Sequence, residues 1–333
     1  MIAQVDSLYV RTRPWKLWSR LLSYGLFEGR PLTTRGRWIN PLVFGHFALE
    51  KRLPQLRAVK KPVFILGTGR SGTTVLGIVL SMHREVGYLN EPKALWHAVY
   101  PKEDLIGSYD AGEGYFRLGV QEASEDVRRT AHRLFGAYLA ATLSRRVLDK
   151  YPELIFRVPF VKAIFPDAKF LVLIRNGWDT SHSIDQWSDR LGMEEGDQTL
   201  DWWGLNGRKW NLLIDQIVPE HADLAAHATA MRSWTDQRHM ALVEWIVTMR
   251  EATKVLRTYS DDAMRVDYEH LCAQPARVLS DITNFLELAR NDAGFLEYGI
   301  RKLRPGRRRN PFVLPTAIDS PFRATMEELG YCV

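Results

Sequence analysis

The sequence lacks the features that mark disulfide-rich, membrane-spanning and zinc-binding proteins. Its 333 residues include only two cysteines, Cys272 and Cys332, too few for a disulfide framework or a cysteine-based zinc site. No apolar run approaches the roughly 18 residues of a membrane span, and the first residues do not follow the basic-then-apolar order of a secretory signal. These absences predict a soluble protein of a reducing compartment, and we expect it in the cytoplasm.

Motifs for catalytic metals are missing as well. The sequence has no His-Glu-x-x-His motif, no EF-hand loop and no closely spaced set of Cys and His ligands. Asp179, Asp185 and Asp189 could be read as magnesium ligands, but charges at this spacing are also typical of a helix surface. We therefore expect no metal site. Signatures of DNA or RNA recognition are absent too, so we expect no nucleic-acid partner.

Positive charge is concentrated at the start of the chain. Residues 1–61 contain twelve Lys and Arg but only three Asp and Glu. Their formal net charge of +9 is larger than the +6 of the whole chain. These bases are interleaved with leucines and with aromatic residues such as Trp15 and Trp18. Two interpretations stay open: an amphipathic surface that contacts anionic lipid or a partner, or helices packed on the rest of the chain with their bases in solvent. We treat residues 1–61 as an N-terminal extension and residues 62–333 as the main domain.

Short apolar runs between longer helical patterns predict the fold class. The runs that read as fully buried strands are Val63–Gly67, Glu153–Val158, Lys169–Arg175 and Ala263–Tyr268. The segments between them show helical periodicity, as in residues 125–148. Strands separated by helices predict an α/β fold, with a parallel sheet between two layers of helices. Ligands of such folds bind at the carboxyl ends of the strands.

A glycine-rich loop, "GTGRSGTT" (residues 67–74), follows the first predicted strand and precedes a helical pattern. This order brings several backbone N–H groups to one point, which predicts an anion site. The spacing matches a phosphate-binding P-loop, but Thr73 stands where such a loop carries Lys. Arg70, inside the loop, could bridge two anionic groups. The loop alone could also hold the nucleotide of a P-loop kinase-like phosphotransferase or merely close a tight corner. A non-catalytic basic membrane- or partner-binding protein is a further alternative, which rests on the N-terminal charge.

The loop resembles the 5′-phosphosulfate-binding loop of sulfotransferases that use 3′-phosphoadenosine 5′-phosphosulfate (PAPS), which carry Lys or Arg before Ser-Gly-Thr-Thr. Two further stretches, "FPDAKFLVLIRNGWDTSHS" and "RVDYEHL", resemble the 3′-phosphate motif and a late strand and turn of that family. The resemblance implies a P-loop-NTPase-like fold, PAPS as the donor, a hydroxyl-bearing acceptor and no need for a metal. The residues it assigns to the donor are Gly69, Arg70, Ser71, Gly72, Thr73, Thr74, Arg175, Ser183 and Tyr268.

The resemblance also implies catalytic residues. "YLNEPKALWH" lies where the glutamate-base branch of glycan and tyrosylprotein sulfotransferases carries its carboxylate, which makes Glu91 the candidate general base. "FRVPF" is similar to a strand that ends in Lys-x-Pro, with Arg157 in place of the lysine. Arg70 and Arg157 would then stabilise charge on the leaving phosphate and the transferring group. The competing proton acceptors are His83, His97 and His182.

The acceptor is constrained less than the donor. The glutamate-base branch acts on carbohydrates and tyrosyl proteins, and a cytoplasmic chain fits a tyrosine of the secretory pathway poorly. We therefore expect a carbohydrate or glycolipid hydroxyl, for which the aromatic stretch "DWWGLNGRKW" (residues 201–210) could provide stacking faces. A second basic run, residues 301–310, has suitable chemistry for the 3′-phosphate of the donor.

Overall fold

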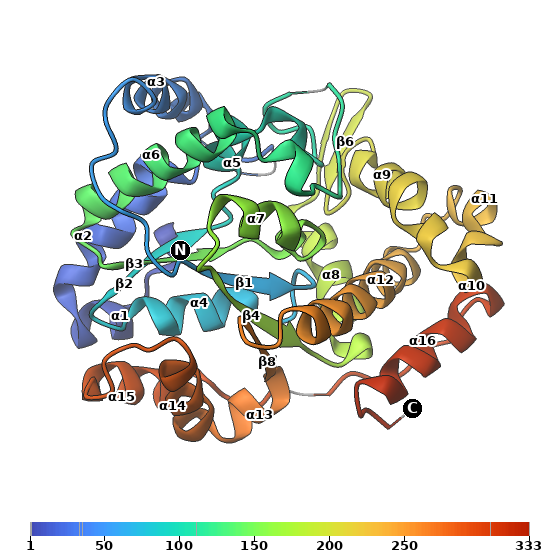
Figure 1. Cartoon of the computed structure of the whole chain (residues 1–333). Helices are drawn as coiled ribbons and strands as arrows, with labels where there is room; N and C mark the ends of the chain where they lie inside the picture. Colours follow the sequence, from blue (N-terminus) through green and yellow to red (C-terminus); the bar gives the residue numbers. More distant parts are fainter. Residues whose placement is uncertain (1, 33, 35, 111, 307, 333) are drawn as a thin grey trace.

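The computed structural model describes residues 2–332, apart from residues 33, 35, 111 and 307. Its centre is a five-stranded parallel sheet in the order β2-β3-β1-β4-β8, with helices on both faces (Figure 1). The strands are β1 (Val63–Gly67), β2 (Val86–Asn90), β3 (Arg146–Lys150), β4 (Lys169–Ile174) and β8 (Ala263–Asp267). This is the predicted α/β fold.

Helices form the two outer layers and the N-terminal extension. The extension holds α1 (Ser7–Thr12), α2 (Pro14–Leu22) and α3 (Asn40–Glu50). The main domain holds α4 (Thr73–Ser81), α5 (Lys93–Val99), α6 (Glu125–Thr142), α7 (Val158–Ile164), α8 (Gly177–Leu191), α9 (Arg208–Gln216), α10 (Ala222–Ala225), α11 (Ala228–Met231), α12 (Gln237–Thr258), α13 (Tyr268–Ala273), α14 (Pro275–Phe285), α15 (Ala293–Lys302) and α16 (Thr316–Glu328).

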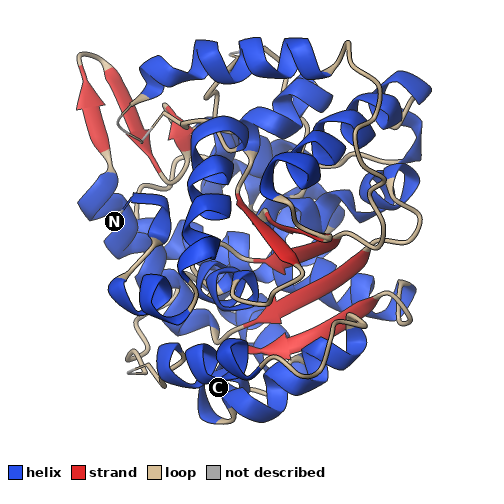
Figure 2. Ribbon diagram, turned by 90° about the vertical axis from the view of Figure 1, so that its left-hand side faces the viewer, coloured by secondary structure: helices blue, strands red, loops and turns tan. Residues whose placement is uncertain are grey.

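A small antiparallel sheet lies apart from the central sheet (Figure 2). Its strands are β5 (Met193–Glu195), β6 (Gln198–Asp201) and β7 (Gly204–Leu205). It follows α8, and it carries the aromatic stretch that begins at Asp201.

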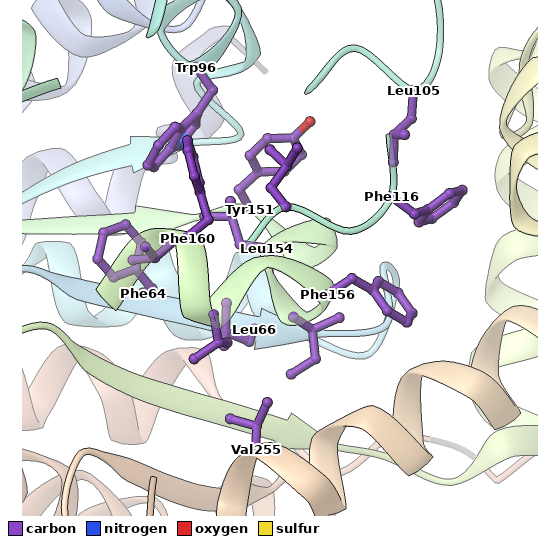
Figure 3. Close-up of a cluster of buried hydrophobic side chains, with 14 of the residues drawn as sticks. Phe64, Leu66, Trp96, Leu105, Phe116, Tyr151, Leu154, Phe156, Phe160 and Val255 are labelled. Atoms are coloured by element: carbon purple, nitrogen blue, oxygen red, sulfur yellow. The ribbon is translucent and has the colours of Figure 1, made fainter. Parts of the chain in front are cut away.

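The central strands divide their side chains between two hydrophobic cores. Along β1, Phe64 and Leu66 pack into one core and Val63 and Ile65 into the other, because successive side chains of a strand point to opposite faces. Figure 3 shows Phe64 and Leu66 in the first core, beneath aromatic side chains such as Trp96 and Phe160. Both faces of the strand are therefore buried, which explains its continuous apolar run.

One predicted strand is wrong. Residues Pro152–Arg157 form a 3₁₀ segment, and α7 follows directly. Pro152 and Pro159 stand in the first turns of these helical segments, where a missing N–H costs nothing. The strand beside β1 is instead β3, within the segment for which we expected a helix to Leu148. That helix, α6, ends because Leu143 adopts a left-handed conformation with φ of 54°.

The N-terminal extension packs on the main domain and covers the open edge of the sheet. β2 is an edge strand, and its outward carbonyl groups accept hydrogen bonds from α2. Lys16 Nζ donates to the carbonyl of Val86 at 2.6 Å, and Arg20 donates to that of Tyr88 at 3.4 Å. Arg20 also forms a buried ion pair with Glu28. Several bases of the extension therefore have structural roles rather than lying in solvent.

No helix among the described residues is long and apolar enough to cross a membrane.

Candidate active site

The glycine-rich loop joins β1 to the start of α4, as the sequence predicted. Gly67 has φ of 139°, and a side chain there would meet the carbonyl oxygen of Leu173 at 2.6 Å. Gly72 has φ of 102°, and a side chain there would lie 2.4 Å from the ring of Tyr268. Only glycine fits these positions. The loop amides and the first turn of α4 thus present the kind of N–H cluster that binds anions.

The predicted donor residues at the neighbouring strand gather beside this loop. Arg175, directly after β4, places its guanidinium 4.4 Å from the centre of the Tyr268 ring and donates to the carbonyl of Arg70 at 2.9 Å. Arg70 in turn donates from Nε to the hydroxyl of Ser183 at 3.3 Å. The buried Nε of Arg175 has no partner among the described residues. A buried guanidinium N–H without an acceptor fits an anionic ligand at this point.

The basic run near the carboxyl end lies along the same helix as Ser183. The backbone N–H of Arg309 donates to Asp179 at 2.7 Å, and His182 Nε2 lies 3.0 Å from the carbonyl oxygen of Asn310. The run therefore packs along α8 next to Ser183, although Arg307 lies outside the described residues. Asp179 and His182 are both used in holding this segment on α8.

Glu91 follows β2 at the same edge of the sheet. Its backbone has φ of 49°, a strained conformation for a residue other than glycine. Its carboxylate accepts a hydrogen bond from Lys150 Nζ, and Lys93 Nζ lies 4.0 Å from its other oxygen. Burial raises the pKa of Glu91, but the two lysines outweigh burial and lower it overall. Glu91 is therefore an ionised carboxylate at neutral pH.

The structure does not bring Arg157 into the candidate site. Its side chain is 1% exposed, forms an ion pair with Glu103 at 3.1 Å and donates to the carbonyls of Glu103, Tyr115 and Phe116. Every nitrogen of its guanidinium is thus occupied within the core, behind the cavity wall. Lys150 stands where we had placed Arg157, because Lys150-Tyr151-Pro152 is the Lys-x-Pro sequence at the end of β3.

The three histidines are not placed to accept a proton from an acceptor at this site. His83 is fully buried, with Nε2 3.0 Å from the carbonyl oxygen of Ala289. His97 packs between the rings of Phe44 and Tyr109. Like His182, neither contributes to the wall of the cavity described next.

A cavity of about 610 Å³ extends from Glu91 and from the glycine-rich loop of residues 67–74, which we call the donor loop. One part of its wall comes from the N-terminal extension, and a second part comes from α8, the small sheet, α9 and α12. Residues of the first part include Tyr24, Glu28, Gly29, Arg30, Pro31, Leu32 and Thr34. Those of the second include Trp187, Leu191, Leu200, Asp201, Trp202, Lys209 and Glu244. The sequence offered no signal that residues 24–34 would reach the active site.

Aromatic and charged groups meet in the second part of the cavity wall. A side chain at Gly69 would lie 2.3 Å from the indole of Trp202, so this tryptophan rests directly on the donor loop. Trp187 packs edge-on against Trp202, with ring centres 5.3 Å apart. Trp202 Nε1 donates to Glu244 at 2.7 Å, and Lys209 Nζ lies 2.5 Å from Glu244. The wall thus combines aromatic faces with hydrogen-bonding groups beside the donor loop.

A paired charge network continues toward Glu91. Glu153 lies 3.7 Å from both Lys93 and Lys209. Burial raises the pKa of Glu153, but these lysines outweigh burial and lower it to about 2.

Among the described residues, no group of three or more His, Cys, Asp or Glu side chains could hold a metal ion.

Comparisons with known proteins give a consistent result. A family model described as "Sulfotransferase family" matches residues 62–203. The chain is 25% identical over 236 residues to the protein-tyrosine sulfotransferase of Drosophila melanogaster, covering 69% of this chain and 39% of that protein. It is 27% identical over 127 residues to nodulation protein NoeE of Sinorhizobium fredii, covering 36% of this chain and 30% of that protein. The chain thus spans less than half the length of either relative.

Solved structures share the fold. The sulfotransferase domain from the curacin biosynthetic pathway superposes with a TM-score of 0.51 at 14% identity, covering 83% of this chain and 99% of that domain. The sulfotransferase domain from the Synechococcus PCC 7002 olefin synthase superposes with a TM-score of 0.50 at 18% identity, covering 84% and 98%.

Proposed function

We propose that this chain, which matches the sulfotransferase family model over residues 62–203, transfers the sulfuryl group of PAPS to a hydroxyl group of an acceptor. The observation that carries the proposal is the meeting of Glu91, Lys150 and Arg70 beside the donor loop. Glu91 accepts a hydrogen bond from Lys150, and Glu91 and Arg70 both line the cavity. A carboxylate paired with a lysine and sharing a cavity with an arginine, at the edge where a P-loop-like fold binds its ligand, suits transfer of an anionic group.

The donor would lie across the ends of β1 and β4. The loop amides of residues 69–74 would hold its 5′-phosphosulfate. Arg175, Ser183 and Tyr268 would hold the 3′-phosphate, and the unpartnered Nε of Arg175 supplies one donor for it. Burial raises the pKa of Tyr268 to about 12, so its hydroxyl stays neutral and can donate a hydrogen bond.

The transfer exchanges one sulfur–oxygen bond for another. The acceptor oxygen bonds to the sulfur as the bond from sulfur to the 5′-phosphate oxygen breaks, and 3′-phosphoadenosine 5′-phosphate (PAP) leaves. Glu91 takes the proton of the acceptor hydroxyl. Arg70, in the cavity wall, stabilises negative charge on the leaving phosphate, and Lys150, buried against Glu91, adds to the positive potential there. The lowered pKa of Glu91 makes it a weak base, which is adequate if, as in phosphoryl transfer, the acceptor oxygen loses its proton late.

For the acceptor we propose a carbohydrate or glycolipid. Trp187 and Trp202 line the cavity next to the donor loop and could stack on a sugar ring, while the buried Lys209–Glu244 pair holds Trp202 in place. A tyrosyl protein is the second candidate, because relatives of this chain are named protein-tyrosine sulfotransferases. We also propose the cytoplasm as its compartment, where the free thiols Cys272 and Cys332 would stay reduced.

Thermal unfolding tests the donor class. A ligand at 100 times its dissociation constant stabilises the native state by about 2.7 kcal/mol, which raises the unfolding midpoint of a protein this size by a few degrees. We expect PAP to raise the midpoint, and ADP or ATP with magnesium to have little effect. Stabilisation by magnesium-ATP without a response to PAP would favour the kinase alternative instead.

A further inference from the structure

The N-terminal extension carries apolar side chains on its outer surface that the proposed reaction does not use. Eight of the fourteen exposed large hydrophobic residues of the described chain lie between residues 15 and 56. We call these eight the outer apolar surface. They are Trp15, Trp18, Leu21, Leu26, Trp38, Leu42, Leu49 and Leu56. Exposed large hydrophobic residues occur singly and scattered on any soluble protein, but here more than half of them lie in about an eighth of the chain.

These residues follow helical spacings rather than random positions. Trp15, Trp18 and Leu21 are three residues apart on α2, and Leu42 and Leu49 are seven apart on α3. Residues three, four and seven apart share one side of a helix, so each helix has an apolar outer stripe. Figure 1 shows both helices at the periphery of the molecule, drawn in blue. On α2 the inner side is occupied by Lys16 and Arg20, which hold the edge strand.

The tryptophans of this surface are the most exposed part of it. Trp15 and Trp18 are 65% and 66% exposed, and Trp38 is 78% exposed. Tryptophan is enriched at the boundary between lipid headgroups and acyl chains, because its ring is apolar and its N–H can form a hydrogen bond.

The exposed charges within residues 1–61 have one sign. Arg11, Arg37, Arg52, Arg57 and Lys60 are exposed. None of the three acids of the segment is exposed, and each has a basic neighbour. These pairs are Asp6 with Lys302, Glu28 with Arg20, and Glu50 with His46. Among the charges of residues 1–61 themselves, the exposed ones are therefore positive, although exposed Asp126 of α6 lies near Lys51 at the end of α3. The rest of the chain carries a net negative formal charge.

We propose that the outer apolar surface docks on an anionic lipid bilayer, with its tryptophans and leucines at the headgroup boundary. Apolar burial and attraction to anionic headgroups together provide the two contributions that stable peripheral binding needs. An uncharged apolar partner would leave the exposed arginines without a counterpart.

Docking would also bring the active-site cavity close to the bilayer. Leu26 precedes the cavity residue Arg30 by four residues, and Trp38 follows the cavity residue Thr34 by four. Four residues span at most about 14 Å. The cavity wall built by the extension therefore lies near the headgroups, so the acceptor is a hydroxyl carried by a lipid headgroup. This last step rests on the proposed function, whereas docking does not.

Vesicle co-sedimentation with the full chain tests the docking. We expect binding to vesicles of phosphatidylcholine mixed with an equal amount of phosphatidylglycerol, and much weaker binding to phosphatidylcholine alone. Binding should weaken between about 0.1 M and about 1 M NaCl, because the Debye length shortens from about 10 Å to about 3 Å. The triple variant Trp15→Ser/Trp18→Ser/Trp38→Ser should bind anionic vesicles at least about tenfold more weakly.

Two controls separate docking from loss of fold. The variant Val120→Ser/Val313→Ser changes exposed apolar residues outside the surface and should bind vesicles like the wild type. The variant Arg11→Gln/Arg37→Gln/Arg52→Gln leaves the apolar residues in place and should lose the preference for anionic vesicles. Each variant should keep the thermal unfolding midpoint of the wild type. If the tryptophan variant has a lower midpoint, vesicle binding by the arginine variant decides whether the surface docks on the bilayer.

Three outcomes would overturn the docking: no binding to anionic vesicles, equal binding to both vesicle types, or wild-type binding by both test variants. A dimer in solution that the tryptophan variant abolishes, without vesicle binding, would assign the surface to a second copy of the chain. The acceptor step is tested by comparing transfer to a glycolipid in anionic vesicles with transfer to its free headgroup sugar. Faster transfer to the sugar overturns that step, and absence of both with intact vesicle binding overturns the proposed function only.

Discussion

Glu91 and Lys150 are joined by a reciprocal pair of hydrogen bonds. The backbone N–H of Glu91 donates to the carbonyl of Lys150 at 2.7 Å, and Lys150 Nζ donates back to the carboxylate of Glu91. Lys150 ends β3 and Glu91 directly follows β2, whose last residue, Asn90, is paired with Lys150, so the sheet register brings the carboxylate close to the ammonium group. The pair therefore has little freedom to separate, which suits an active site whose groups must be held in place before the substrate arrives.

Replacing Lys150 tests the electrostatic half of this pair. We expect Lys150→Ala to lower kcat by about 10²- to 10³-fold, because the leaving phosphate loses a preorganised cation. Lys150→Arg should recover part of the loss. Steady-state kinetics with saturating PAPS measures both, and an alanine variant with wild-type kcat would remove Lys150 from the mechanism.

We also expect Lys150→Ala to change the dependence of kcat on pH. In the wild type the lysines keep the pKa of Glu91 below its ordinary value of 4.5, so the carboxylate is ionised and able to accept a proton throughout the neutral range. Without Lys150 burial has less opposition, and the pKa of Glu91 rises. The acid limb of the kcat profile should therefore move to higher pH in Lys150→Ala. Superimposable profiles of the two proteins would speak against Glu91 as the base.

Glu91→Gln tests the base directly. The amide keeps the size of the side chain but cannot take a proton, and we expect transfer to fall by about 10²- to 10⁴-fold. PAP should still bind, because the donor contacts lie on the loop and at Arg175. Isothermal titration measures that binding alongside the rate, and retained transfer would exclude Glu91 as the proton acceptor.

We expect the loss of Arg175 to affect donor binding and the loss of Arg157 to affect stability. Arg175→Ala should weaken PAP binding by about 10- to 100-fold, the value of a lost charge-assisted hydrogen bond, and should leave the thermal midpoint near that of the wild type. Equal affinities of the variant and the wild type would contradict the 3′-phosphate assignment.

Arg157→Ala should instead destabilise the fold. It leaves Glu103 buried without its cation, and breaking a buried pair in this way costs about 3–5 kcal/mol. Chemical denaturation measures the loss. An Arg157→Ala protein of normal stability that binds PAP normally but transfers no sulfuryl group would restore Arg157 to the active site.

Deletion of residues 1–61 should prevent folding. It would uncover the edge of β2, remove the partners of the Val86 and Tyr88 carbonyls, and open the core around Phe47. Circular dichroism and gel filtration would report this as lost helix content and aggregation. A soluble, folded product would show that the extension is a separable unit.

The positions of the proposed donor-binding residues could be predicted from the sequence because their signals are local. The glycine-rich loop, Arg175 and Ser183 each lie within a few residues of a strand that reads as buried, so their place at the sheet edge follows from the pattern. Lys150 was missed for a physical reason. β3 buries Asp149 and Lys150, and two charged residues broke the apolar run that marks a buried strand.

The acceptor half could not be predicted in the same way. Its walls come from residues 24–34, from the small sheet and from α12, which are far apart in the sequence and meet only in the folded chain. The strained backbone of Glu91 likewise has no signature in the sequence. Composition did indicate the charge of residues 1–61, but not that Lys16 and Arg20 would be buried against an edge strand.

The decisive experiment follows the labelled sulfuryl group of ³⁵S-PAPS into a panel of glycan, glycolipid and tyrosyl-peptide acceptors. We expect the wild type to release PAP and to label one acceptor class in equal amounts, and Glu91→Gln to bind the donor without labelling any of them. If the wild type binds PAPS but labels nothing in the panel while hydrolysing it no faster than buffer, the chain is not a catalyst of the kind proposed.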